Sequence, residues 1–134
     1  MSEFTIVHNG KTYANFTAQG LKAKGIPETV IDAALADKRL IAVKAECRRR
    51  IYGQASQETQ MNMATATAAI AGKAVADRSA EEVTLLTSTK AALDWVGAMR
   101  ARCPDLAADP DADFKLGASW PECPPEVVAL TEQF

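Results

Sequence analysis

Apolar and polar residues alternate over residues 4–16, which is the pattern of two half-buried β-strands. Between them lies Asn9-Gly10, a dipeptide that favours a type I′ turn because both central residues of that turn need positive φ. The pattern predicts a β-hairpin in which Ile6 faces Tyr13 and Phe4 faces Asn15. A two-stranded ribbon is marginal by itself, so we expect it to lie on another element or on a partner.

Helical signals follow the hairpin. Thr17 is suited to cap a short helix over residues 18–24, and Gly25 is suited to end it in the left-handed conformation. Pro27 favours the first turn of a second short helix, which we expect to run to about Asp37.

The longest helical pattern covers about residues 38–76. Apolar residues recur there at steps of mostly three or four: Leu40, Val43, Cys47, Ile51, Ala55, Met63, Ala66 and Ile70. Gly53 and the polar run Gln54–Gln60 weaken the middle of the pattern, so a kink or a break at that point stays an open alternative.

A second long helix is predicted from Ser79, where Ser79-Ala80-Glu81-Glu82 has the capping-box pattern. We expect Pro104 to stop this helix. Its apolar stripe consists of Leu85, Ala92, Val96, Met99 and Cys103, widened by Leu86 and Leu93. Because only residues 76–79 connect the two long helices, they are expected to form an antiparallel hairpin.

The character of the chain changes after Pro104. Aspartates among Ala and Pro predict a loop, Trp120–Pro125 predicts a stiff aromatic segment, and a last short helix is expected over 126–133. The predicted fold is therefore mainly α. Residues 1–37 hold the β-hairpin and two short helices, residues 38–104 the helical hairpin, and residues 105–134 an acidic, Pro-rich tail.

Composition adds two constraints. The 134 residues suit one domain, and a 48% hydrophobic fraction excludes intrinsic disorder, but only 6% are aromatic and much of the apolar content is alanine. The core is thus expected to be thin, which favours docking on a partner or a homo-oligomer. The net charge of -2 gives no long-range attraction for nucleic acid or an anionic membrane, and no signal peptide or run of ~20 apolar residues is recognisable.

Cysteine usage favours a reducing compartment. Cys47 and Cys103 occupy helical positions that suit small buried side chains, and Cys123 makes the number odd. One Cys–Cys pair remains a minor alternative.

Motifs for chemistry are weak. Asp109-x-Asp111-x-Asp113 has the spacing of a calcium loop, but Phe114 stands where the loop needs glycine and Trp120 where it needs an acid, which favours a solvated loop. Arg48-Arg49-Arg50 cannot form one phosphate-binding patch, because consecutive helical residues point about 100° apart.

Two further features bear on function. The segment Leu21–Pro27 is similar to part of a helix-hairpin-helix DNA-binding module but lacks its second glycine. His8, the single histidine, has no local nucleophile or carboxylate that would make a catalytic pair. The sequence therefore predicts no catalytic residues, no metal site and no cofactor.

Several stretches together carry a family resemblance. They are Ile41–Ile51 with its Lys-Ala-Glu-x-x-Arg-Arg-Ile pattern, Gln60–Met63, Ala92–Cys103 and Ala118–Pro125. In this order they resemble a region of small tail-associated or tail-fibre proteins of bacteriophages and prophages, particularly those of α-proteobacteria. The resemblance covers about residues 40–125 and implies a virion component or a fibre-assembly factor, without enzymatic activity.

The expected function is thus that of a non-enzymatic structural component of a phage tail, made in the host bacterial cytoplasm, which docks on tail-fibre or baseplate proteins. A tail-fibre assembly chaperone absent from the mature virion is the alternative, and a weak nucleic-acid-binding module is a third. No membrane is expected as a partner. We expect docking through the hairpin end or the tail, not through a central cleft, and the candidate residues are Phe4, Ile6, Tyr13, Trp120, Pro121 and Pro124.

Overall fold

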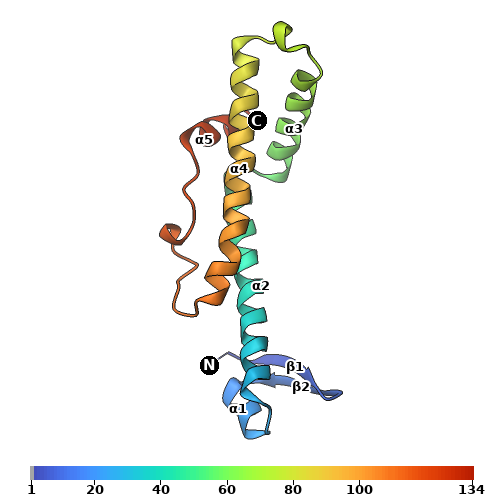
Figure 1. Cartoon of the computed structure of the whole chain (residues 1–134), viewed down its shortest axis with the longest axis vertical. Helices are drawn as coiled ribbons and strands as arrows, with labels where there is room; N and C mark the ends of the chain where they lie inside the picture. The colour runs from blue at the N-terminus through green and yellow to red at the C-terminus, as the bar shows by residue number, and fades with distance from the viewer. Residues whose placement is uncertain (1) are drawn as a thin grey trace.

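The structure, a computed structural model, describes residues 2–134 and is mainly helical, as predicted. Its long axis is formed by two long helices, with the β-hairpin at one end (Figure 1). In chain order the elements are β1 (Phe4–His8), β2 (Lys11–Phe16), α1 (Ala18–Ala23), α2 (Glu28–Gln54), α3 (Gln57–Ala71), the 3-10 turn η1 (Val75–Asp77), α4 (Ala80–Ala108), the 3-10 turn η2 (Gly117–Ser119) and α5 (Pro125–Thr131).

The hairpin has the predicted turn but a different register at its open end. Asn9 and Gly10 both have positive φ, 50° and 75°, as a type I′ turn requires. Ile6 faces Tyr13 as predicted, but Phe4 faces Phe16 and not Asn15. The reason is Asn15, which adopts a φ of 58° and adds a bulge to β2.

The helices after the hairpin begin and end largely at the predicted residues. Thr17 Oγ1 accepts a hydrogen bond from the Gly20 amide at 3.0 Å, and Gly25 has a φ of 81°. The helix after Pro27 does not end near Asp37, however, but continues to Gln54. No Gly or Pro interrupts residues 28–52, so nothing in the local sequence stops the helix there.

The break that the polar run suggested is present. Helix α2 ends at Gln54, Ala55 is extended, and Ser56 caps α3 by accepting a hydrogen bond from the Thr59 amide at 3.1 Å. The stretch predicted over residues 38–76 is therefore divided between α2 and α3.

Helix α4 starts with the predicted capping box of Ser79 and Glu82. Pro104 does not stop it, since the helix continues to Ala108. A proline removes its own bond to the carbonyl four residues earlier, here that of the exposed Arg100, and its ring crowds that carbonyl. After Pro104, Leu106 is buried and its carbonyl accepts a hydrogen bond from Arg39 Nε at 2.9 Å. These two contacts compensate for the hydrogen bond that Pro104 cannot make, so the helix continues.

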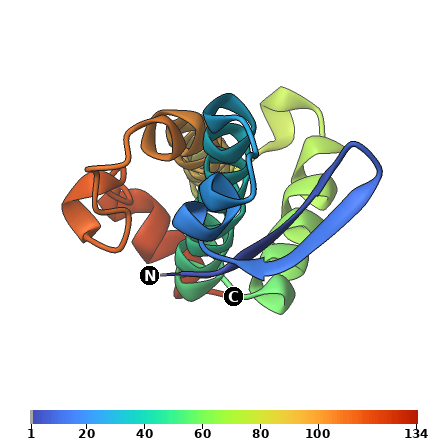
Figure 2. The ribbon, with the colours of Figure 1, turned by 90° about the horizontal axis from the view of Figure 1, so that it is seen from below.

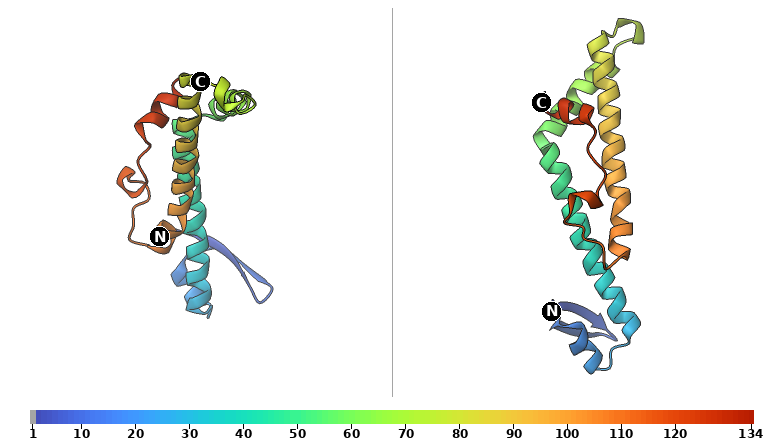
Figure 3. Two further views of the ribbon diagram at one scale, coloured as in Figure 1. Left: turned by 45° about the horizontal axis from the view of Figure 1, so that its top comes forward. Right: turned by 90° about the vertical axis from the view of Figure 1, so that its left-hand side faces the viewer.

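Helices α2 and α4 are antiparallel and pack on each other through their C-terminal parts, and α3 also packs on α4. The tail from residue 109 crosses one side of the α2–α4 pair, while α3 lies on the other (Figures 2 and 3). The central core combines both helices with the tail: Val43, Cys47, Ile51, Trp95, Met99, Cys103, Leu106 and Trp120. The predicted stripe is thereby confirmed, except that Leu93 is 68% exposed and does not belong to the core.

Two smaller clusters complete the packing. The hairpin rests on α1 and the start of α2 through Phe4, Ile6, Leu21, Ile26 and Ile31. At the other end of the molecule, α3, α4 and α5 meet through Met63, Ala92, Val127 and Leu130.

Candidate functional site

One side of the α2–α4 pair is occupied by the chain's own tail. A buried carboxylate on this side, Glu46, pairs with cations of α2 and of the tail. Glu46 is 3% exposed and accepts two hydrogen bonds from Arg49, at 2.6 and 2.9 Å. It also pairs with Arg50 at 3.0 Å and with Lys115 of the tail at 3.6 Å. The Arg49 hydrogen bonds, helped by these cations and opposed by burial, lower the pKa of Glu46 to about 2.

Arginines on this side donate to tail carbonyls. Arg39 Nη2 bonds Ala112 at 2.6 Å, Arg50 Nη2 bonds Lys115 at 2.7 Å, and Arg102 Nε bonds Ser119 at 3.0 Å. Such bonds satisfy backbone groups of a segment that has little regular structure of its own. The tail is therefore a folded part of the domain.

The tail residues predicted to bind a partner contribute to this intramolecular packing. Trp120 is 7% exposed, lies in the central core, and donates from Nε1 to the Phe114 carbonyl at 2.7 Å. The Pro121 carbonyl accepts from Trp95 Nε1 at 3.2 Å, and Pro124 is the N-cap of α5. Trp120 is thus not available as an exposed anchor, and Trp95 is likewise a core residue.

The hairpin candidates are similarly placed. Phe4 and Ile6 are buried against α1 and α2, and Tyr13 is half-buried beside them. The sheet has only these two strands, so each strand keeps one edge without a strand neighbour in the part of the chain described.

The other side of the α2–α4 pair carries a groove of about 830 Å³, called the open groove below. Both helices contribute one face to it, because the lining residues follow at steps of three and four and the tail-facing residues fall between them. It is lined by Lys44, Cys47, Arg48, Ile51 and Tyr52 of α2, Ser56, Gln57 and Gln60 at the start of α3, and Val96, Arg100, Cys103 and Pro104 of α4.

All charged residues in this groove are cations. Lys44, Arg48 and Arg100 line it, and no acidic residue does. The side chains of these three make no ion pair or hydrogen bond with any residue in 2–134. The tail-facing arginines, in contrast, are all bonded. The groove thus presents positive charge that the described chain leaves unneutralised.

An apolar pocket of about 480 Å³ continues the open groove toward α3. Ile51, Gln60 and Val96 line both, so the two spaces adjoin. Helices α2, α3 and α4 contribute to its walls. The space stays open because several of the lining side chains are small, namely Ala64 and Ala68 of α3 and Ala92 of α4. The exposed Leu93 lies at its wall.

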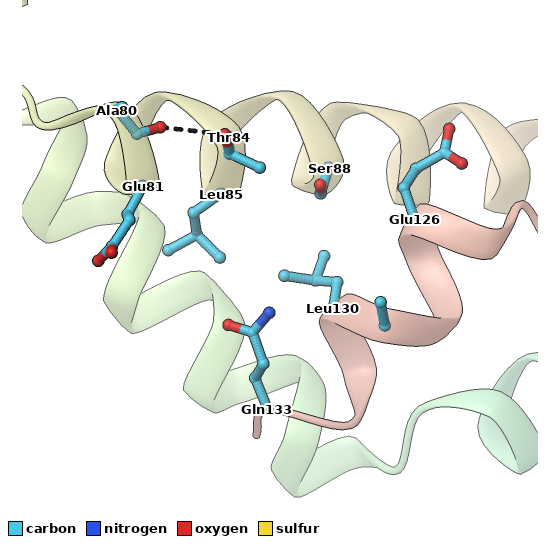
Figure 4. Close-up of a pocket in the computed structure, with 9 residues that line it drawn as sticks. Ala80, Glu81, Thr84, Leu85, Ser88, Glu126, Leu130 and Gln133 are labelled. Atoms are coloured by element: carbon cyan, nitrogen blue, oxygen red, sulfur yellow. Dashed lines mark hydrogen bonds between the residues drawn. The ribbon is translucent and has the colours of Figure 1, made fainter.

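A separate hollow of about 560 Å³ lies between α4 and α5 (Figure 4). It is lined by the carboxylates Glu81 and Glu126 together with Leu85 and Leu130, and it shares no lining residue with the open groove. Thr84 at its wall donates its hydroxyl to the Ala80 carbonyl at 3.0 Å, so this hydroxyl is already engaged in the helix.

The thiols behave as buried packing groups. Cys47 and Cys103 are buried, as predicted, and all three cysteines are free. Burial, helped by a contact with Cys103, raises the pKa of Cys47 to about 11. Cys123 is half-buried, and burial raises its pKa as well.

The open groove was missed at the level of sequence. The separation of the three consecutive arginines was correctly predicted: Arg48 lines the groove, Arg49 pairs with Glu46, and Arg50 bonds the tail. The available signal was the pair of cations Lys44 and Arg48, which are one turn apart beside the apolar stripe.

Other candidate motifs have local roles. Asp109 Oδ1 accepts from the Asp111 amide and Asp113 Oδ1 from the Lys115 amide, both within loop turns. Within residues 2–134, no cluster of at least three His, Cys, Asp or Glu side chains is placed to hold a metal ion. Nor do these residues include a helix with the length and apolarity needed to cross a membrane. Comparison with protein-family models and with curated proteins gives no match.

Proposed function

We propose that this protein is a non-enzymatic structural component of a bacteriophage tail and docks on tail-fibre or baseplate proteins through the open groove. The groove replaces the hairpin end and the tail that we expected from the sequence, because Phe4, Ile6 and Trp120 are buried within the domain. The observation that carries the docking role is a long groove with an apolar floor and cations that have no partner in the described chain. The assignment to a tail rests on the resemblance of residues 40–125 to small tail-associated proteins.

Apolar side chains that the chain leaves exposed beside the groove favour docking. Tyr52 and Leu93 are large apolar side chains exposed along the groove and its adjoining pocket, with 47% and 68% of their surfaces accessible. A partner that covers them gains roughly 25 cal/mol for each Å² of apolar surface buried. Since the tail covers only the opposite side, this gain is left for another molecule.

A tail-fibre assembly chaperone is the second candidate. The same groove would then hold a fibre segment only until assembly is complete. A chaperone is distinguished by its absence from finished particles, because its complex with the fibre is transient.

Mass spectrometry of purified particles tests the proposal. The tail-component role predicts the protein at a fixed ratio to the known tail proteins after stringent purification. Absence from particles, together with binding to free fibre protein in infected cells, would support the chaperone instead. Absence from both would contradict either role.

A further inference from the structure

We infer that the open groove receives an acidic amphipathic helix of a partner protein, with apolar side chains that enter the adjoining pocket. The inference rests on the proposed docking role and specifies the chemistry of the occupant. Two features define that chemistry: the charges along the groove and the shape of its apolar floor.

The charges select an acidic partner. Lys44 and Arg48 are one turn apart on α2, and Arg100 lies on α4, so cations stand on both helices that form the groove. The neutralising carboxylates of the domain lie elsewhere: Glu46 faces the tail, and Glu81 lines the hollow near α5. Carboxylates of a bound segment would pair with these three cations. The groove would therefore bind an acidic segment more tightly than a basic one.

The floor selects apolar side chains at helical spacing. Ile51 and Val96 lie at the junction of groove and pocket, and the pocket beyond them is walled mainly by apolar groups. A space of about 480 Å³ accommodates more than one large aliphatic or aromatic side chain. A helix that lies in a groove presents such side chains at positions i, i+3, i+4 and i+7.

Nucleic acid is the less suitable occupant. Its affinity comes mainly from many phosphate contacts, whereas this groove offers three cations in a chain of net charge -2. A phosphate backbone would also leave the apolar pocket empty. Charge and apolar floor together therefore favour a peptide.

The test uses the full-length protein and a fluorescein-labelled peptide of about 18 residues, about five helical turns, with Leu on one face and Glu on its flanks. We expect saturable binding in fluorescence anisotropy and NMR shifts concentrated at groove residues such as Val96 and Cys103. The matched peptide, with Lys in place of Glu, should bind with an affinity that is lower by about tenfold or more. Raising the salt from about 50 mM to about 300 mM should weaken binding of the Glu peptide.

Variants tie the binding to the groove. The double substitution Arg48→Glu and Arg100→Glu should weaken binding of the Glu peptide by about tenfold or more and should strengthen binding of the Lys peptide. Lys90→Glu changes an exposed cation of α4 that lies outside the groove and pairs with Asp94, so it controls for a charge reversal elsewhere on this helix and should change the binding of neither peptide. Circular dichroism checks that each variant is folded.

Several results would overturn the inference. These are no binding of the Glu peptide, equal binding of both peptides, or NMR shifts away from the groove. Preferential binding of a labelled single-stranded oligonucleotide at the same residues would replace the peptide with nucleic acid. Self-association abolished by the double substitution would replace it with a second copy of the chain. Particle composition is measured independently, so a protein found in tails that binds no such peptide refutes only this inference.

Discussion

The two sides of the α2–α4 pair use similar residues for different purposes. On the tail side, Arg39, Arg50 and Arg102 donate to backbone carbonyls, and Trp120 fills the core between the helices. On the groove side, Arg48 and Arg100 have no partner in the described chain. The difference indicates that cations on one side stabilise the fold, while those on the other remain free for recognition.

Among substitutions on the two sides, Trp120→Ala is expected to have the largest effect on stability, because it removes the tail's main contribution to the core. Loss of a buried tryptophan should lower the free energy of unfolding by about 3–5 kcal/mol. The half-exposed Tyr52 gives the matched control, since Tyr52→Ala should cost less than about 1 kcal/mol. Urea unfolding measures both, and equal losses would show that the two sides do not differ in their contribution to stability.

Glu46→Gln should have the next largest effect. The substitution leaves Arg50 and Lys115 without their carboxylate and should cost about 1–3 kcal/mol. Because the pKa of Glu46 is lowered from 4.5 to about 2, its ionic contribution is fully present above pH 4.5 and is lost as the pH falls toward 2.

This pH dependence can be measured by thermal unfolding at a series of pH values. The wild-type protein should lose part of its advantage over Glu46→Gln between pH 4.5 and 2. A stability difference between the two proteins that does not change over this range would show that Arg49 and the neighbouring cations do not lower the pKa of Glu46.

A smaller effect concerns thiol access. Cys47 and Cys103 lie in the groove wall but are buried, and the pKa of Cys47 is raised to about 11, so its reactive thiolate is scarce at pH 8. Cys123 is only half-buried and should react first with iodoacetamide. Peptide mapping of timed samples gives the order, and faster labelling of Cys47 would mean that the groove opens to its floor in solution.

The smallest effect on stability is expected at Leu93, which belongs to the groove side. Because it is 68% exposed, Leu93→Ala should change the free energy of unfolding by less than about 0.5 kcal/mol. Ala substitution of Leu106 in the same helix, which is buried, should cost about 2–5 kcal/mol. A large loss at Leu93 would show that the adjoining pocket closes around it.

Local signals account for most of the fold that sequence could predict. The Asn9-Gly10 turn, the Thr17 and Ser79 caps and the apolar stripe of α2 each depend on residues close in the chain. The bulge at Asn15 was not predictable in this way, because an asparagine has the left-handed conformation as one choice among several.

The features that were missed depend on distant contacts. Continuation of α4 past Pro104 follows from the burial of Leu106 and its bond to Arg39, 67 residues earlier. Leu93 is adjacent to the stripe on a helical wheel, but α3 presents the small side chains Ala64 and Ala68 to this pocket, and an open space remains beside Leu93. The docked tail, likewise, depends on arginines far from it in sequence, so a Trp-Pro segment was equally compatible with a free anchor.

The site shows the same limit more strongly. Sequence identified Arg48-Arg49-Arg50 as three residues that point apart, and Glu46 of the same helix pairs with Arg49 and Arg50 but not with Arg48. Which of them also bonds the tail depends on the position of the Lys115 carbonyl, far away in sequence. Arg100 joins Lys44 and Arg48 because the antiparallel pairing of α2 and α4 sets the register between the helices. Such a register is not written in the periodicity of either helix alone.

The most direct test of the docking role is the amount of the Arg48→Glu and Arg100→Glu double variant in purified tails, relative to wild-type protein and to Lys90→Glu. Both substituted sites are exposed, so the variant should unfold at nearly the wild-type temperature. Quantitative mass spectrometry should then find it reduced about tenfold in tails, with Lys90→Glu at the wild-type level. A folded double variant that enters tails as well as the wild-type protein would contradict the open groove as the docking surface.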